Sequence, residues 1–360
     1  MLLPNTKRRP GAGVMRHECR PSGSAILRSA WVVTMMTLIA AILTACDSDS
    51  PPTFNLPLDC VPGETCWVVG YVDVDPGPGA KDFTCGGQTS DKASGTQFAI
   101  RDLGAMRAGV AVRAAASGVV KQTRDGMRDA DFRTESWSEI NNRICGNGVK
   151  IDHGGGWSSN YCHMKKRSVR VREGQTVKAG DILGLVGMSG ETIFPRLHFG
   201  VWHDGKVIDP FTGRTDPSSC GTKSEPLWRG SAQHAMPYQP VTLYNIGIAG
   251  RKPTASFIRN RGKERSNNLS RVRSLALWVD MFYVEQNDTL HFAMIGPDGK
   301  SIISRTIQIR KRKARQFNFV GKRRKSKPWA SGIYKGTVTL TRRMPGGDVR
   351  VSAKTEVQVR

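Results

Sequence analysis

Apolar residues along the chain gather in short runs, and glycine-rich segments separate these runs. In the first part of the chain the runs lie at residues 110–120, 149–152, 169–177, 182–186 and 197–201. Short runs rich in Val and Ile and bounded by turn residues predict β-strands. No long stretch keeps the spacing of an amphipathic helix, so this part of the chain is predicted to be all-β.

The last third of the chain shows the same kind of pattern. Alternating runs lie at residues 275–279, 289–295, 334–340 and 349–359, and Pro-Asp-Gly at 297–299 is a strong turn signal. About 120 residues with this pattern suit a small β-sandwich. The expected fold class is therefore mainly β, with an antiparallel β domain followed by a small β-sandwich domain.

The net charge of +24 is distributed unevenly and marks a domain boundary. Residues 46–240 contain 22 basic and 22 acidic side chains, whereas residues 241–360 contain 26 basic and 7 acidic ones. The stretch 230–240 includes two prolines and is the predicted linker. A charged stretch at 125–140 is predicted to be an exposed loop with one helical turn. A chain of 360 residues is long enough for two domains with separate cores.

The start of the chain has the composition of an export signal. Six basic residues precede an uncharged run at 30–45, which is short for a membrane span of about 20 residues. The run ends in Leu-Thr-Ala-Cys at 43–46, which resembles a bacterial lipobox. The resemblance implies cleavage before Cys46 and lipidation of that residue. The leader is long for a signal peptide, which makes Met15 an alternative start.

These features predict an exported lipoprotein, anchored in the membrane on the periplasmic side of the cell envelope. The alternative is an uncleaved membrane anchor with Cys46 beyond it. Residues 46–58, which begin with a stretch rich in Ser, Asp and Pro, are the predicted tether between the anchor and the folded part.

Six cysteines follow the predicted anchor, and an even number in an exported chain favours disulfides. Cys145 and Cys162 flank a predicted hairpin whose turn, residues 153–156, lies near the midpoint between them. This symmetry places the two residues opposite each other, at a spacing compatible with a disulfide. Metal binding by the cysteines is the alternative, although no paired Cys-x-x-Cys spacing occurs. For the four cysteines that remain, the expected pairs are Cys60–Cys66 and Cys85–Cys220, although spacing does not exclude the other pairings.

The most specific signal is a set of motifs between residues 160 and 199. A glycine-rich hairpin at 174–190 leads into Pro-Arg-Leu-His-Phe at 195–199, and Asn-Tyr-Cys-His stands upstream at 160–163. This order resembles the lysostaphin/LytM-type zinc metallopeptidases, which are peptidoglycan endopeptidases with a duplicated hybrid motif domain. The resemblance covers roughly residues 71–213. Lipoyl and biotinyl carrier domains share the hairpin, but they need an acceptor lysine at its tip, and none stands there.

The resemblance implies which residues belong to the site. The family takes His and Asp from an H-x-G-x-D motif and a further His from the second position of H-x-H as zinc ligands. His198 matches the third ligand, and His163 matches one of two catalytic histidines. Ala93 and Gln97 stand where the ligand histidine and aspartate belong, and Arg196 replaces the first histidine of H-x-H, which is the other catalytic one.

These replacements predict a degenerate metal site that binds zinc weakly or not at all. Catalytic zinc needs three ligands drawn from His, Cys and carboxylates, and the loss of even a supporting residue costs about 10–100-fold in affinity. Gln97 supplies only a neutral amide, and Arg196 adds a permanent positive charge. Replacement of the missing ligands by other residues near these motifs is the less favoured alternative, and the candidates are Asp91, Asp102, His153 and His203.

Two dense basic runs in the last domain are predicted to bind anions. An exported lipoprotein meets anionic headgroups and acidic wall polymers, and not nucleic acid, and each basic residue near an anionic surface contributes about 1 kcal/mol. The residues are Arg310, Lys311, Arg312, Lys313, Lys322, Arg323, Arg324 and Lys325.

The sequence is compatible with three functions. The preferred one is a non-catalytic lipoprotein that binds peptidoglycan or regulates cell-wall hydrolases. The others are an active zinc endopeptidase with rearranged ligands and a purely structural surface protein. The expected organisation is a signal peptide at 1–45, a tether at 46–58, a LytM-type peptidase-like domain at 59–229, a linker at 230–240 and a basic β-sandwich domain at 241–360.

Overall fold

The computed structural model describes residues 50–214, 220–221, 224–260, 269–344 and 346–360. The predicted signal peptide and the lipidation site Cys46 lie outside these residues. Among the described residues, no helix is both long enough and apolar enough to cross a membrane.

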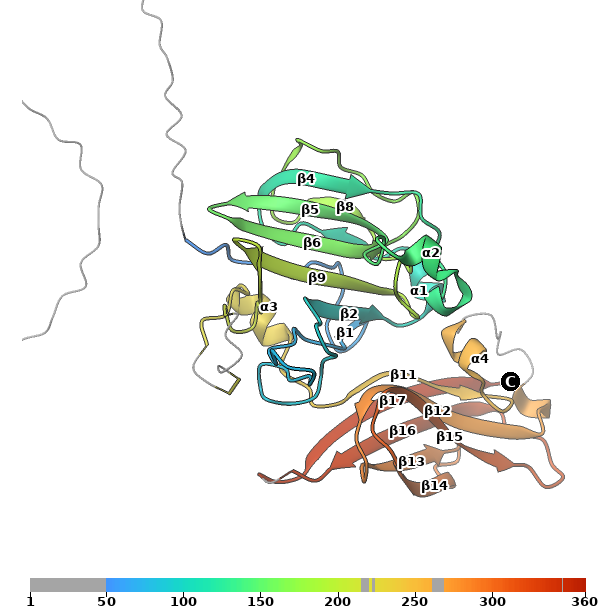
Figure 1. Ribbon diagram of the computed structural model, residues 1–360. Coiled ribbons are helices and arrows are strands. Elements are labelled where there is room, and N and C mark those ends of the chain that lie inside the picture. The colour runs from blue at the N-terminus through green and yellow to red at the C-terminus, as the bar shows by residue number, and fades with distance from the viewer. Residues whose placement is uncertain (1–49, 215–219, 222–223, 261–268, 345) are drawn as a thin grey trace, which may run out of the picture. The chain divides into compact units, whose positions relative to one another are not determined.

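The first domain is built on an eight-stranded antiparallel sheet (Figure 1). The strand order is β1-β2-β9-β6-β5-β4-β7, and β10 pairs with β9. A two-stranded sheet, β3-β8, packs into the same core. The bounds are β1 Cys66–Val68, β2 Thr96–Ile100, β3 Ala111–Arg113, β4 Gly118–Arg124, β5 Asn147–Gly154, β6 Trp157–Met164, β7 Thr176–Val177, β8 Ile182–Leu185, β9 Arg196–His203 and β10 Lys206–Ile208.

Helices in the described part of the chain are short, as the sequence pattern predicts. The insertion at 125–140 contains a 3-10 turn and one helical turn, which confirms that prediction. The helical elements are α1 Leu103–Ala108, η1 Phe132–Thr134, α2 Trp137–Ile140, α3 Gly230–Ala235, α4 Ala255–Arg259 and η3 Leu269–Arg271.

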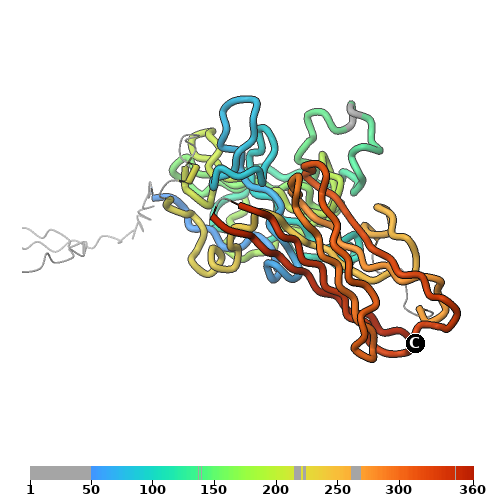
Figure 2. The backbone as a smooth tube through the Cα atoms, turned by 90° about the horizontal axis from the view of Figure 1, so that it is seen from below, coloured from blue at the N-terminus to red at the C-terminus, as the bar shows by residue number. Residues whose placement is uncertain are grey.

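The second domain is a β-sandwich of two antiparallel sheets. One has the order β11-β12-β15 and the other β14-β13-β16-β17, and apolar side chains from both form one core. Figure 2 shows its strands as long, nearly aligned tubes. The bounds are β11 Thr242–Ala249, β12 Ser274–Val284, β13 Thr289–Ile295, β14 Ser301–Gln308, β15 Lys313–Arg323, β16 Gly332–Arg342 and β17 Val349–Val359.

The side chains of strand β9 point alternately into the core of the first domain and to the opposite face of the sheet, where the candidate site lies. Leu197, Phe199 and Val201 are fully buried in the core of the first domain. Successive side chains of a strand point to opposite faces, so Arg196 and His198 lie on the other face of the sheet. That face is open to a cavity.

Four segments differ from the sequence-based prediction. Residues 110–120, predicted to be one strand, contribute to two separate strands, β3 and β4, which belong to different sheets. Residues 169–177, predicted to be one strand, form only β7, and the rest of the segment is irregular. Phe54 and Leu58, in the predicted tether, are buried in the core. The predicted linker contains α3, with Met236 buried behind it. Burial of these apolar side chains stabilises both segments, and the composition of a segment does not show which of its apolar residues will be buried.

The structure contains the three predicted disulfides. The sulfur atoms are bonded in Cys60–Cys66, Cys85–Cys220 and Cys145–Cys162. The hairpin argument for the last pair is confirmed, because β5 and β6 pair antiparallel with Val149 opposite Tyr161.

Candidate functional site

A cavity of about 590 Å³ opens on the outer face of the first domain's sheet. It lies where β2, β9 and β6 run side by side, because Gln97 and Cys162 are the register partners of His198 on its two sides. The structure brings all five residues transferred from the sequence resemblance to the wall of this one cavity. They are Ala93, Gln97, His163, Arg196 and His198.

A chain of hydrogen bonds links Arg196, Gln97 and His198. An Arg196 terminal nitrogen donates to Gln97 Oε1, and Gln97 Nε2 lies 2.7 Å from His198 Nδ1. Because a guanidinium only donates, it fixes the amide orientation, so Gln97 Nε2 donates to His198 Nδ1. His198 therefore accepts at Nδ1, and its ring proton is on Nε2.

The loop before β9 holds Arg196 in place. The Nε atom of Arg196 donates to Thr192 Oγ1 at 3.0 Å, and the second terminal nitrogen of the guanidinium donates to the Glu191 carbonyl at 3.0 Å. Three of the five N–H groups of the guanidinium are thus engaged within the protein. Burial lowers the pKa of Arg196 to about 10, so it stays cationic at neutral pH.

His163 reaches the cavity through an unusual backbone conformation. Its φ of 66° lies in the left-handed region, which is uncommon for residues other than glycine. Its side chain is buried, and Nδ1 donates to the Ser189 carbonyl at 2.9 Å. The rings of His163 and His198 are 6.2 Å apart and nearly perpendicular.

Both histidines are held neutral. Burial, with Arg196 adding to it, lowers the pKa of His198 to about 3. Burial also lowers the pKa of His163 well below 6.5, with Arg196 and His198 contributing in the same direction. Gly95 permits the close packing around His198, since a Cβ at that position would lie 2.8 Å from Nε2 of the ring.

Acidification is expected to destabilise the protein through His198. Its pKa falls from 6.5 to about 3 on folding, so below pH 6.5 the folded state binds fewer protons and stability is lost as the pH falls. Lowering the pH from 7 to 5 costs about 2 kcal/mol for such a group. His198→Asn keeps an acceptor near Nδ1 and does not titrate, so it should lose less stability than the wild type between pH 7 and pH 5 in urea denaturation. Equal losses would contradict this assignment.

The residues at this site do not fit a zinc ion. The described residues contain no group of three or more His, Cys, Asp or Glu side chains that could hold a metal. One ring nitrogen of His198 accepts from Gln97 and the other carries the proton, so the neutral ring offers no free lone pair. The positive charge of Arg196 opposes a cation in the same cavity.

The four candidate replacement ligands have different surroundings. The ring nitrogens of His153 form hydrogen bonds with the Ser117 carbonyl and the Ser159 hydroxyl, and the His203 ring stacks on Trp157. Asp102 caps the start of α1. Asp91 lines the cavity but is exposed. The structure therefore assembles no replacement ligand set from the described residues.

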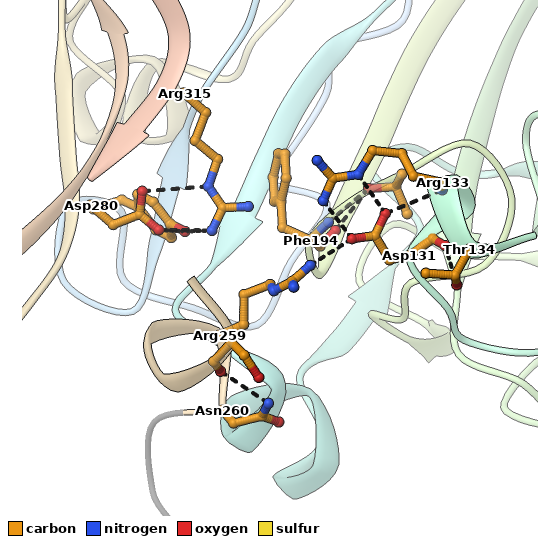
Figure 3. Close-up of polar contacts among 11 residues, drawn as sticks. Asp131, Arg133, Thr134, Phe194, Arg259, Asn260, Asp280 and Arg315 are labelled. Carbon is orange, nitrogen blue, oxygen red and sulfur yellow. Dashed lines mark hydrogen bonds and ion pairs between the residues drawn. The ribbon is translucent and has the colours of Figure 1, made fainter. Parts of the chain in front are cut away.

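The second domain reaches the rim of the cavity, which the sequence did not indicate. Phe194 lines the cavity and packs on Phe282, with ring centroids 4.8 Å apart. Arg315 lies 5.2 Å from the Phe194 ring and donates to Asp280 at 2.7 Å (Figure 3). Burial raises the pKa of Tyr283 to about 12, an effect that the nearby Arg196 offsets in part.

A second polar contact joins the insertion of the first domain to α4. Asp131 accepts hydrogen bonds from Arg133 and Arg259 (Figure 3). These bonds, with that of the Arg133 side chain the strongest, lower the pKa of Asp131 to about 2. No local pattern in the sequence marks either contact, because each joins a residue of the first domain to a residue of the second.

The two basic runs do not form one surface. Lys313 and Arg323 are the first and last residues of β15, so they lie about 33 Å apart at 3.3 Å per residue. In the first run, Arg312 pairs with Glu285 and donates to the Gly87 carbonyl. The second run, residues 322–327, lines a groove of about 410 Å³ that ends at Trp329.

Comparison with known proteins agrees with this fold. Residues 95–210 match the model of peptidase family M23. The peptidoglycan DD-endopeptidase ShyA of Vibrio cholerae is 29% identical over 132 residues, which cover 37% of this chain and 25% of that protein. Cell division protein DipM of Caulobacter vibrioides is 39% identical over 64 residues, which cover 18% of this chain and 10% of that protein.

Among solved structures, the catalytic domain of the prophage-encoded protein EnpA of Enterococcus faecalis is 21% identical, with a TM-score of 0.28; the match covers 48% of this chain and 97% of that one. The chain spans a quarter or less of the length of the two curated relatives named above. The sequence resemblance and the family match coincide on the domain that holds the cavity, and this chain therefore carries a domain of peptidase family M23 at residues 95–210.

Proposed function

We propose that this protein is a cell-envelope lipoprotein whose M23-type domain binds peptidoglycan without cleaving it. The observation that supports the proposal is the hydrogen-bonded chain Arg196–Gln97–His198. In the lysostaphin/LytM-type family, the positions of Gln97 and His198 hold zinc ligands, and the position of Arg196 holds a catalytic histidine. The cavity itself is retained, and Arg196 has two further N–H groups for an anionic ligand such as the carboxylate of a peptide.

The setting of the protein is part of the proposal. Lipidation at Cys46 would hold the domain at the membrane surface, on the periplasmic side. The relatives named for peptidoglycan cleavage and for cell division support a substrate in the cell wall. A wall hydrolase bound by the same domain is the second form of the proposal, in which the retained cavity receives a segment of the enzyme.

The full chain, purified in the presence of zinc, is expected to hold much less than one zinc per molecule and to release no fragments from purified sacculi. It is expected to sediment with those sacculi. Ser94→Trp, which fills the cavity, should weaken the affinity for sacculi about tenfold, which corresponds to about 1.4 kcal/mol. Ser304→Trp, at an exposed position on β14, is the matched control and should bind as the wild type does.

Stoichiometric zinc, with cleavage abolished by His198→Ala, would overturn the proposal in favour of an active endopeptidase. Absence of sedimentation with sacculi would leave a wall hydrolase as the partner. Absence of binding to either would favour the purely structural function.

The basic groove of the second domain supports an additional anionic contact. Arg324 is fixed by the carbonyls of Arg271, Val272 and Ser326, while the lysines beside it are exposed. We propose that it contacts anionic headgroups or wall polymers. In the same sedimentation assay, retention should fall as salt rises, because exposed charges are screened within about 10 Å at 0.1 M. Retention independent of salt would contradict this contact.

A further inference from the structure

The open face of the sheet continues past His198. Gly200 and Trp202 follow it at alternate positions of β9, on the face that carries the cavity. A second cavity, of about 700 Å³, lies along this face and shares two lining residues with the first. Those residues are Asn160 and Trp202.

The indole of Trp202 lies against the strand that carries it. A Cβ at position 200 would come within 2.3 Å of Cη2 of Trp202, so only glycine allows the six-membered ring to rest on the backbone there. Trp202 is partly exposed, and it lines both cavities. An aromatic ring supported from behind and open to a cavity is a platform for an apolar face of a ligand.

Asn160 lies beside this platform with an unused polar atom. Its register partner on β9 is Gly200, and its Oδ1 is buried with no hydrogen-bond partner among the described residues. Buried polar atoms nearly always have partners, so an acceptor left without one beside a cavity indicates a missing donor. Lys150, the partner of Asn160 on β5, is partly exposed and lines the second cavity together with the exposed Gln122.

We propose that this second cavity is a saccharide subsite. A pyranose ring has an apolar face of C–H groups, which suits the indole of Trp202, and equatorial hydroxyl or acetamide groups, which suit Asn160, Lys150 and Gln122. Pockets of this kind combine an apolar platform with a few fixed polar groups. The ligand class is a β-linked amino-sugar chain, and the inference rests on the proposed binding of peptidoglycan: the first cavity receives the peptide and the second receives the glycan.

The test uses the full chain and N-acetylglucosamine tetramer, a glycan that carries no peptide, in isothermal titration calorimetry. The wild type is expected to bind. Trp202→Leu should weaken binding at least about tenfold, and Trp202→Phe should keep part of it because the aromatic platform remains. Asn160→Ala should weaken binding as well. Phe319→Leu, which removes a partly buried aromatic ring of the second domain that lines neither cavity nor the basic groove, should leave it unchanged.

The outcomes distinguish failure of the saccharide subsite from failure of the proposed binding of peptidoglycan. If the wild type sediments with sacculi but does not bind the tetramer, the saccharide subsite is wrong and the proposed function stands. If it binds neither, both are wrong. Tetramer binding that survives Trp202→Leu, in a variant whose circular dichroism and melting temperature match the wild type, also overturns the subsite.

Discussion

The triple variant Ala93→His, Gln97→Asp, Arg196→His is expected to bind zinc at least about 10³-fold more tightly than the wild type. The variant supplies two ligands, and the loss of even a supporting residue at a zinc site costs about 10–100-fold. Removing Gln97 also frees Nδ1 of His198, which in the wild type accepts the amide hydrogen. Removing Arg196 takes away a buried cation whose pKa, about 10, keeps it charged.

Competition with a zinc-selective chelating dye measures the change. Ser94→His in place of Ala93→His is the matched control, because residue 94 lines the same cavity one position away and would place the imidazole out of register. The variant that keeps Arg196 should gain less, since the new carboxylate at position 97 would pair with the guanidinium. Wild-type zinc binding as tight as that of the triple variant would show that the site never lost its metal.

The sequence predicted which residues share the cavity but not how they interact. Alternation along β9 and the family motifs placed His198, Arg196 and Gln97 together. The bond from Arg196 to Gln97 depends on the register of β2 against β9, in which Gln97 faces His198. A register of two strands more than 90 residues apart is set by packing of the whole sheet, and no local pattern contains it.

Two other features of the site were beyond sequence reasoning for different reasons. His163 enters the cavity because its backbone takes φ 66°, whereas a regular strand at that position would alternate. Phe282 and Arg315 reach Phe194 from the second domain, and such a contact depends on how complete domains pack. The disulfide between Cys145 and Cys162 was predictable because the hairpin that joins them is short.

Arg342→Met is expected to destabilise the protein by about 3–5 kcal/mol, the cost of leaving one partner of a buried ion pair alone. Arg342 and Asp288 form a two-bond pair at 2.9 and 2.7 Å, and their side chains are 9% and 1% exposed. The same guanidinium donates to the carbonyls of Pro240 and Tyr283 at 2.6 and 2.7 Å.

Urea denaturation of Arg342→Met and of Arg350→Met measures this effect. Arg350 is exposed on the adjacent strand β17, so its substitution is the matched control and should change stability by less than about 0.5 kcal/mol. The double variant Arg342→Met, Asp288→Leu should recover much of the loss, because it removes the unpaired carboxylate. If the double variant is no more stable than Arg342→Met, the loss comes from the bonds to Pro240 and Tyr283. Those bonds hold the start of the second domain beside Tyr283, whose hydroxyl lies close to Gly70 of the first domain.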